Sequence, residues 1–303
     1  MKAAVLRDGG AARARIPPGA RPARRVSPIT LHNIRNGLFF VSPWLFGLLA
    51  FTLYPLLASA YYSLTDYTIV KAARWVGLAN YQELFTTYHL FYTALGNTLY
   101  FAAIDIPLSA ILAIGLALLL NVKVKGMAFY RTLFYMPSIV PTICSSMLWL
   151  WILNPQYGLA NEVLRQLGLP TLGWIASPQW SKPSLIIMDL WGAGAAVVIY
   201  LAGLQDIPES LYEAAELDGA NSLRKTWHIT LPMLTPVIFF NLVMALIGSF
   251  LFYALLIYRN AFNYFKMGFA SAMSWILFLI VLALTLLLFR SSDRWVYYGG
   301  ALR

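Results

Sequence analysis

Hydrophobic residues along this chain gather in long blocks separated by short polar segments. The hydrocarbon core of a bilayer is about 30 Å thick, and a helix of about 20 residues crosses it. Six apolar stretches reach that length, at residues 38–60, 92–120, 130–152, 184–204, 233–256 and 269–289. The pattern predicts an all-α, polytopic membrane protein with six transmembrane helices. Several prolines fall inside the spans, where membrane helices tolerate them if neighbouring groups satisfy the freed carbonyls.

The composition agrees with a membrane protein. Of the 303 residues, 60% are hydrophobic and only 11% are charged, and the mean hydropathy is +0.66. An ordinary soluble domain is far less apolar. The net charge of +10 would suggest nucleic acid in a soluble protein, but the basic residues collect at span ends and in alternate loops. We therefore expect a lipid bilayer and no nucleic acid as partner.

The distribution of Lys and Arg predicts the orientation. Sixteen of the 22 basic residues fall on one side if the amino terminus is cytoplasmic, and eight of them lie in a proline-rich tail over residues 1–35. We expect this tail to be disordered and the transmembrane domain to cover residues 36–303. The positive-inside rule then places both termini in the cytoplasm. The chain is therefore expected to be a multi-pass membrane protein.

A charged insert over residues 205–232 separates the fourth and fifth spans. The residues from Glu213 to Leu217 favour helix, Gly219 can adopt the positive φ that ends one, and Pro232 suits the start of the next. The sequence therefore predicts two short helices, joined by a break, on the cytoplasmic surface of the membrane. Charge alone is compatible with a solvated loop or with a docking surface.

Motifs for catalysis and metal binding are missing from the sequence. There is no G-x-x-x-x-G-K-[ST] phosphate loop, so the chain lacks the backbone cradle and the lysine with which that class of ATPase works. H-E-x-x-H, paired-Cys and G-x-S-x-G patterns are also missing. We expect no catalytic residue and no metal site.

Asp105 and Asp189 are the acidic residues inside the predicted spans. Because a carboxylate in lipid is costly, each should face a cavity, a partner or water, and such residues are candidates for a substrate pathway. Trp191 and Gly192 follow Asp189 closely and join it as pathway candidates. A purely structural role in helix packing remains open, since small residues such as Gly192 also allow membrane helices to approach closely.

The spacing within the charged insert resembles a known signature. Glu213-Ala-Ala, three residues, Gly219, nine residues, Ile229, one residue and Leu231-Pro232 resemble the EAA motif of permease subunits of ATP-binding-cassette importers. Supporting stretches include Ser42-Pro-Trp-Leu-Phe46 and Leu201-Ala-Gly-Leu-Gln205. From about residue 28 onward, the chain resembles the permease of a binding-protein-dependent carbohydrate importer of the maltose and glycerol-phosphate type.

The resemblance implies a role for the insert and a set of partners. The residues that it assigns to coupling with a separate ATPase are Glu213, Ala214, Ala215, Gly219, Ile229, Leu231 and Pro232. The expected partners are a second, related permease, an ATPase dimer and an extracytoplasmic sugar-binding protein. This chain should bind no cofactor itself, because ATP and Mg are used by the ATPase. Transport would alternate between inward-open and outward-open states.

One part of the sequence departs from the pattern of that family. After Phe250 the family usually continues through an extracytoplasmic stretch with a glycine-rich, proline-containing turn. Here the sequence runs directly into Leu251 and the apolar residues that follow. We expect residues 259–268 to form a tight external turn that preserves the topology. The missing segment puts full activity in doubt, because its loss would impair gating or contact with the binding protein.

Two other functions are compatible with the residues considered without the resemblance. An ion-coupled secondary transporter would use Asp105 and Asp189 as coupling sites and need no ATPase. A membrane scaffold or sensor would use the charged insert to recruit a cytoplasmic protein without moving a solute. Proton-dependent uptake without an ATPase would favour the first, and an assembly without substrate-stimulated ATP hydrolysis would favour the second.

Overall fold

A computed structural model of the chain describes residues 28–122 and 124–297. The chain divides into two compact units, one ending at Leu57 and the other beginning at Ala58. Most of the tail expected over residues 1–35 lies outside the described residues. Its last part is helical rather than disordered, because helix α1 (Pro28–Leu48) begins there. Proline is favoured in the first turn of a helix, where its missing N–H is not needed.

The described part of the first unit is one apolar helical stretch, which continues past Leu57 to Ser63. The helix α1 continues through a π-helical turn, η1 (Leu49–Leu53), into α2 (Tyr54–Ser63). Residues His32–Ser63 are long and apolar enough to cross a membrane. Large aromatic side chains are open along it, and the exposed fractions of Phe40 and Phe51 are 80% and 77%. A continuous apolar surface of this kind suits contact with lipid or with another membrane helix.

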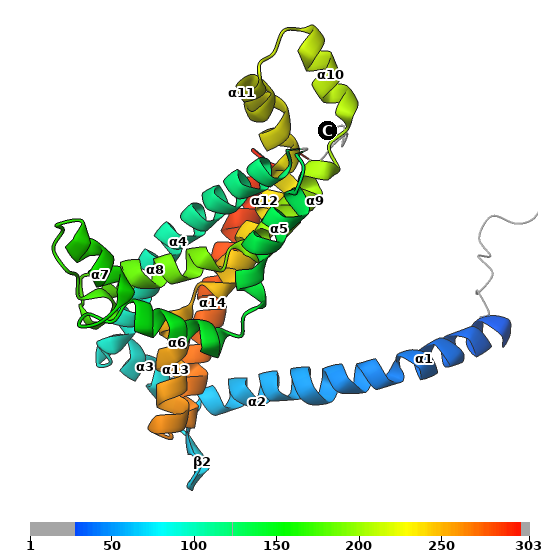
Figure 1. Cartoon of the computed structure of the whole chain (residues 1–303). Coiled ribbons are helices and arrows are strands. Elements are labelled where there is room, and N and C mark those ends of the chain that lie inside the picture. The colour runs from blue at the N-terminus through cyan, green and yellow to red at the C-terminus, as the bar shows by residue number, and fades with distance from the viewer. Residues whose placement is uncertain (1–27, 123, 298–303) are drawn as a thin grey trace, which may run out of the picture. The chain divides into compact units, whose positions relative to one another are not determined.

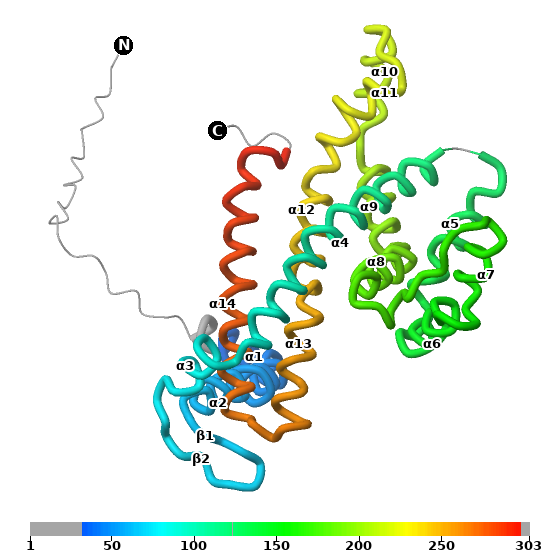
Figure 2. Tube along the Cα trace, turned by 90° about the vertical axis from the view of Figure 1, so that its left-hand side faces the viewer, coloured from blue at the N-terminus to red at the C-terminus, as the bar shows by residue number. Residues whose placement is uncertain are grey.

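The second unit holds the remaining helices and one β-hairpin (Figure 1). The helices are α3 (Ala79–Thr86), α4 (Leu90–Leu120), α5 (Met127–Tyr135), α6 (Thr142–Ile152), α7 (Leu159–Gln166), α8 (Ser181–Trp191), α9 (Gly194–Gln205), α10 (Glu209–Leu217), α11 (Ser222–Lys225), α12 (Leu231–Gly248), α13 (Leu251–Tyr258) and α14 (Met267–Ser292). The hairpin pairs strand β1 (Thr65–Thr68) with β2 (Lys71–Trp75) in antiparallel register. Within this unit, α10 and α11 project at one end, and the β-hairpin lies at the opposite end (Figures 1 and 2).

Two of the six predicted spans are not continuous helices. Four helical segments are long and apolar enough to cross a membrane among the described residues: His32–Ser63, Leu90–Leu120, Ser222–Asn263 and Met267–Ser292. The span predicted at 130–152 is instead a pair of helices bent by 95°, and the span at 184–204 is a pair bent by 48°. The number of spans is therefore four, or up to six if each bent pair crosses as one. Pro141 lies at the first break and Gly192 at the second, so the sequence carries the cause of both.

The core of the second unit forms where α4, α9 and α12 pack together. Ala113 and Ala117 of α4 are fully buried against Tyr200 of α9 and Leu234 of α12. Small residues on α4 let the helices approach closely, as is common in membrane bundles. At the start of α9, a Cβ added to Gly194 would lie 2.5 Å from the carbonyl oxygen of Phe134, so only glycine fits there.

The turn between the last two spans is even shorter than expected. A π-helical turn, η5 (Arg259–Asn263), extends α13, and α14 begins at Met267. Phe265 in the connection has φ of 55°, and the backbone N–H of Lys266 donates to the carbonyl of Asn260 at 2.9 Å. The Asn260 side chain is buried and donates to the Tyr88 hydroxyl at 2.9 Å. The prediction of a tight turn within residues 259–268 is confirmed.

Candidate functional site: a surface hairpin and a cavity between helices

The charged insert forms a helical hairpin whose turn is fixed by its own backbone. The helix α10 ends at Leu217, and Gly219, two residues further on, has φ of 75°. The N–H of Ala220 donates to the carbonyl of Ala215 at 2.9 Å, and the N–H of Gly219 donates to that of Glu216 at 3.0 Å. These two bonds make a Schellman motif, which needs a left-handed residue at the position of Gly219. The predicted helix, break and helix are confirmed.

Side chains then join the two arms of this hairpin, which we define as residues 209–230. The Asn221 side chain accepts from the N–H of Arg224 at 2.9 Å and so caps α11. Lys225 lies 2.7 Å from Glu216 on the other arm. The hydrogen bond and charge of Lys225 hold the pKa of the Glu216 carboxyl below its usual range. The hairpin is thus closed by local contacts rather than by the bundle.

The hairpin connects to α12 through a π-helical turn, η4 (Thr226–Thr230). The hydroxyl groups of Tyr212 and Thr230 lie 3.0 Å apart and join α10 to this turn. Ile229 packs against the core that contains Leu234. Leu231 and Pro232 form the first turn of α12, where proline is favoured. The last three residues of the predicted motif therefore lie at the root of the hairpin.

The outer surface of the hairpin presents apolar side chains. The exposed fraction of Leu217 is 91%, and those of Leu223 and Trp227 are 66% and 63%. Ala214 is exposed, and Ala215 lines a small hollow of about 240 Å³ between the two arms. Exposed apolar side chains on a charged element suit contact with another protein or with the membrane surface.

Glu213 faces a different hollow on the inner side of α10. This hollow has a volume of about 780 Å³ and is lined by the carboxylates of Asp206, Glu209, Glu213 and Glu216, with Lys225 beside them. Glu213 forms no ion pair with any residue in the described part of the chain. Its exposed carboxylate is therefore accessible to a basic group of a partner.

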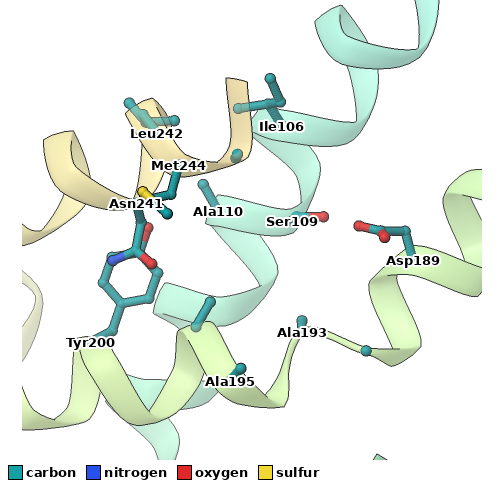
Figure 3. A pocket seen from close by; sticks show the side chains of 13 residues that line it. Ile106, Ser109, Ala110, Asp189, Ala193, Ala195, Tyr200, Asn241, Leu242 and Met244 are labelled. Carbon is teal, nitrogen blue, oxygen red and sulfur yellow. The ribbon is translucent and has the colours of Figure 1, made fainter. Parts of the chain in front are cut away.

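The two acidic residues of the predicted spans meet beside a second cavity. This cavity has a volume of about 280 Å³ and lies between α4, α8, α9 and α12, with Asp189 and Gly192 in its lining. Figure 3 shows the Asp189 carboxyl and the Ser109 hydroxyl pointing toward one another. Asp105 is buried, with an exposed fraction of 6%, and its carboxyl lies close enough to that of Asp189 for the two groups to interact. Two residues distant in sequence therefore form one carboxyl pair.

Trp191, the remaining pathway candidate, lies next to the break between α8 and α9. Its ring packs edge to face against Trp149 of α6, with centroids 6.0 Å apart. It does not line the cavity that contains Asp189. In this chain, Trp191 therefore supports the bent helix pair.

Three polar residues of the cavity were not identified from the sequence. Ser109, Tyr200 and Asn241 line it together with Asp189. Ser109 is four residues from Asp105 and so lies on the same face of α4, a signal that the sequence does carry. Tyr200 and Asn241 stand among apolar residues of α9 and α12, and only the packing of these helices brings them together.

The arrangement of the helices matches a known fold. The solved structure of a bacterial ABC transporter involved in the import of the acidic polysaccharide alginate has a chain that superposes with a TM-score of 0.78, at 24% identity, over 88% of this chain and 99% of that one. The same alginate transporter has been solved with an alginate pentasaccharide-bound periplasmic protein. The fold is therefore that of a transmembrane subunit of an ABC importer.

The sequence comparisons then identify the family. Residues 105–296 match the family described as binding-protein-dependent transport system inner membrane component, and the chain belongs to this family. The probable ABC transporter permease protein YesP of Bacillus subtilis is 38% identical, over 92% of this chain and 97% of YesP. The trehalose/maltose transport system permease protein MalF of Thermococcus litoralis is 31% identical, over 86% of this chain and 94% of MalF. This membership confirms the resemblance and does not favour an ion-coupled transporter or a scaffold.

Proposed function

We propose that this chain is the permease subunit of an ATP-driven carbohydrate importer and forms the translocation pathway with a second, related permease. Support comes from the family and from a trehalose/maltose permease among the similar proteins. In this proposal the chain hydrolyses no ATP itself, since a separate ATPase dimer uses ATP and Mg. Both termini lie in the cytoplasm of a bacterial cell, and the chain resides in the inner membrane.

The hairpin over residues 209–230 is the coupling element of this proposal. The observation that carries it is the Schellman turn at Gly219, which holds a rigid, partly apolar surface clear of the bundle. Glu213, Ala214 and Ala215 lie on α10, before the turn, while Ile229, Leu231 and Pro232 connect the hairpin to α12. Because α12 also lines the cavity with Asp189, a displacement of the hairpin reaches the pathway through one helix.

The cavity beside Asp189 is this chain's part of the pathway. Support comes from its position between four helices and from the polar side chains of Ser109, Asp189 and Asn241 in its lining. An extracytoplasmic sugar-binding protein delivers the solute to the opposite end of the bundle from the hairpin. The alginate transporter with the same fold has been solved with such a periplasmic protein, which supports this partner.

Affinity purification of the tagged chain from its native membrane tests the proposal. Mass spectrometry should recover a cassette ATPase and a second permease with the unaltered chain. Glu213→Lys should lose the ATPase and keep the second permease, because it reverses the charge of an exposed side chain on α10 that is accessible to a basic group of the ATPase. Glu162→Lys, the same charge change on α7, is the matched control and should keep both. Recovery of neither partner with the unaltered chain would refute the importer proposal.

The shortened connection after Phe250 remains part of the proposal. We infer that topology is preserved by the turn between Asn263 and Met267, and that gating or contact with the binding protein is weakened. The test compares transport by this chain with transport by a version that carries the corresponding segment of a related permease after Phe250. A faster rate in the extended version is expected, and equal rates would show that the segment is dispensable.

A further inference from the structure

The charge of the cavity beside Asp189 is the most informative feature that the proposed function leaves unused. Asp189 is the sole charged side chain among the thirteen lining residues, and no Lys, Arg or His of the described chain lines it. The carboxyl of Asp105 stands directly behind Asp189 and is buried. Asp189 is therefore the group through which this wall of the cavity can carry a negative charge.

This carboxyl pair has capacity for further hydrogen bonds. The Oδ1 atom of Asp105 and the Oγ atom of Ser109 are buried and have no hydrogen-bond partner among the described residues. Buried polar atoms without partners are rare in native proteins and usually mark a function or a bound molecule. Figure 3 shows Ser109 directed toward Asp189 across the space that the cavity leaves. Because Ser109 lines the cavity, a solute bound there is a suitable hydrogen-bond partner for its hydroxyl group.

A nearby cation on α8 does not neutralise the pair. Lys182 is seven residues before Asp189, about two helical turns away. Its Nζ donates to the Asn97 side chain at 3.1 Å and lies 4.6 Å from the centre of the Tyr100 ring. The Lys182 ammonium group is thus held by α4, and it does not line the cavity.

We propose that Asp189, backed by Asp105, selects the charge of the transported solute, admitting saccharides that offer hydroxyl or ammonium donors and rejecting those that carry carboxylate or phosphate. This inference rests on the proposed function and deepens it. An ionised carboxylate only accepts hydrogen bonds, and hydroxyl and ammonium groups are the donors that neutral and amino sugars carry. An anionic sugar would be repelled in a cavity where water screens poorly.

The fold by itself does not dictate this selectivity. The alginate transporter shares the arrangement of helices, and its substrate is an acidic polysaccharide. The preference proposed here therefore depends on the particular side chains at positions 105 and 189. The cavity of about 280 Å³ is near the lower limit of about 300 Å³ for small-molecule pockets, so this wall contacts a small part of an oligosaccharide at a time.

Charge-selective thiol labelling tests the inference without knowledge of the sugar. Cys144 is the one cysteine of the chain, so Ser109→Cys in a Cys144→Ala background gives a single thiol in the cavity. Native membranes containing this chain are treated with a cationic methanethiosulfonate, and in parallel with an anionic one. The ratio of the two rates cancels the reactivity of the thiol itself. Thr171→Cys, exposed in the segment after α7, is the control. It gives the ratio of the two labelling rates for a thiol outside the cavity.

The cationic reagent should react at least about tenfold faster than the anionic one at Ser109→Cys, relative to the ratio at Thr171→Cys. Adding Asp189→Asn should bring the ratio close to the control value, and Asp189→Lys should reverse the preference. Asp66→Asn removes an acid from the β-hairpin and should leave the ratio unchanged. Equal rates for the two reagents, a ratio insensitive to Asp189→Asn, or no labelling by either reagent would overturn the proposal.

Transport by the purified assembly in liposomes gives the second measurement. Import of neutral or glucosamine oligosaccharides without galacturonate oligosaccharides is expected. Import of galacturonate oligosaccharides would overturn the charge preference and leave the importer function standing. An assembly that lacks the ATPase would refute the importer function, whereas the labelling ratios would still report the charge of the cavity.

Discussion

The hairpin at one end of the second unit and the cavity within the bundle are held in shape by different kinds of contact. In the hairpin, Gly219, Asn221 and Lys225 all bond with residues fewer than ten positions away. In the cavity, Asp105 and Asp189 are 84 positions apart and meet only because α4 packs against α8. Local hydrogen bonds define the first element, and helix packing defines the second.

This difference predicts how each region fails. A change in the hairpin should alter docking to a partner and leave the bundle intact, because few contacts connect it to the core. A change at a helix contact beside the cavity should destabilise the bundle as a whole, since that interior is close-packed. The predictions below separate these two outcomes.

Gly194→Val should have the largest effect, and it should act on the bundle. The added side chain would collide with the carbonyl oxygen of Phe134, which belongs to the backbone and cannot turn away. Overpacking of this kind costs about 1–3 kcal/mol. We expect a lower thermal unfolding midpoint in detergent, measured by fluorescence-detected size exclusion. Gly96→Val, where an added Cβ meets no atom within 4 Å, is the control, and equal midpoints for the two variants would contradict the close packing at Gly194.

Gly219→Ala should come next, and it should act on docking. The substitution forces an L residue to φ of 75°, which costs about 1–2 kcal/mol. We expect roughly fivefold less ATPase to co-purify with the chain, at an unchanged unfolding midpoint. Gly115→Ala in α4, at an open helical position, should retain the ATPase. A lower midpoint in Gly219→Ala would mean that the hairpin supports the bundle after all.

Tyr212→Phe should have a smaller effect, confined to the root of the hairpin. It removes the hydrogen bond to the Thr230 hydroxyl, and one such bond contributes about 1 kcal/mol. We expect amide hydrogen exchange over residues 226–230 to become several times faster, measured by mass spectrometry, with exchange in α4 unchanged. Tyr264→Phe, at an exposed site, is the control and should leave the exchange rates of both segments unchanged. Unaltered exchange at residues 226–230 would show that α10 and the π-helical turn are not linked through Tyr212.

The ion pair between Glu216 and Lys225 should give the smallest effect, and it should depend on pH. Because the folded hairpin lowers the pKa of Glu216, the pair stabilises the hairpin at neutral pH. This contribution is lost as the pH falls through the lowered pKa. Hydrogen exchange in α10 should therefore accelerate toward acidic pH after correction for the intrinsic exchange rate. Glu216→Gln should remove this dependence, and an identical profile in both chains would exclude the pair as its source.

The sequence predicted the hairpin well because its signals are local. Helix formers in α10, a glycine for the left-handed turn and a proline at the start of α12 are each sufficient for their own element. The long helices α4 and α14 were likewise predictable from apolar length alone. Hydropathy failed at the bent pairs, since α5 with α6 and α8 with α9 have enough apolar residues for one span each but change direction at Pro141 and Gly192.

The cavity was predictable only in part. Because burying a carboxylate in a membrane costs free energy, the sequence identified Asp105 and Asp189 as candidates, each independently of the other. Their contact, and the approach of Tyr200 and Asn241, depend on which faces of four helices meet. Trp191, which the sequence offered for the substrate pathway, does not line this cavity and packs against Trp149. The residue pattern of one helix does not indicate how a neighbouring helix is rotated about its own axis. These contacts could therefore not be deduced from the sequence.

The Schellman turn at Gly219 has a consequence for how such permeases diversify. A segment whose shape depends on its own residues from 209 to 230 can be exchanged between chains as a module, with its geometry preserved. The walls of a solute pathway can then change by substitution in distant helices while the module stays constant. Under the proposed function, one ATPase can in this way serve several permeases with different sugars, and exchange of the hairpin changes which ATPase a permease binds.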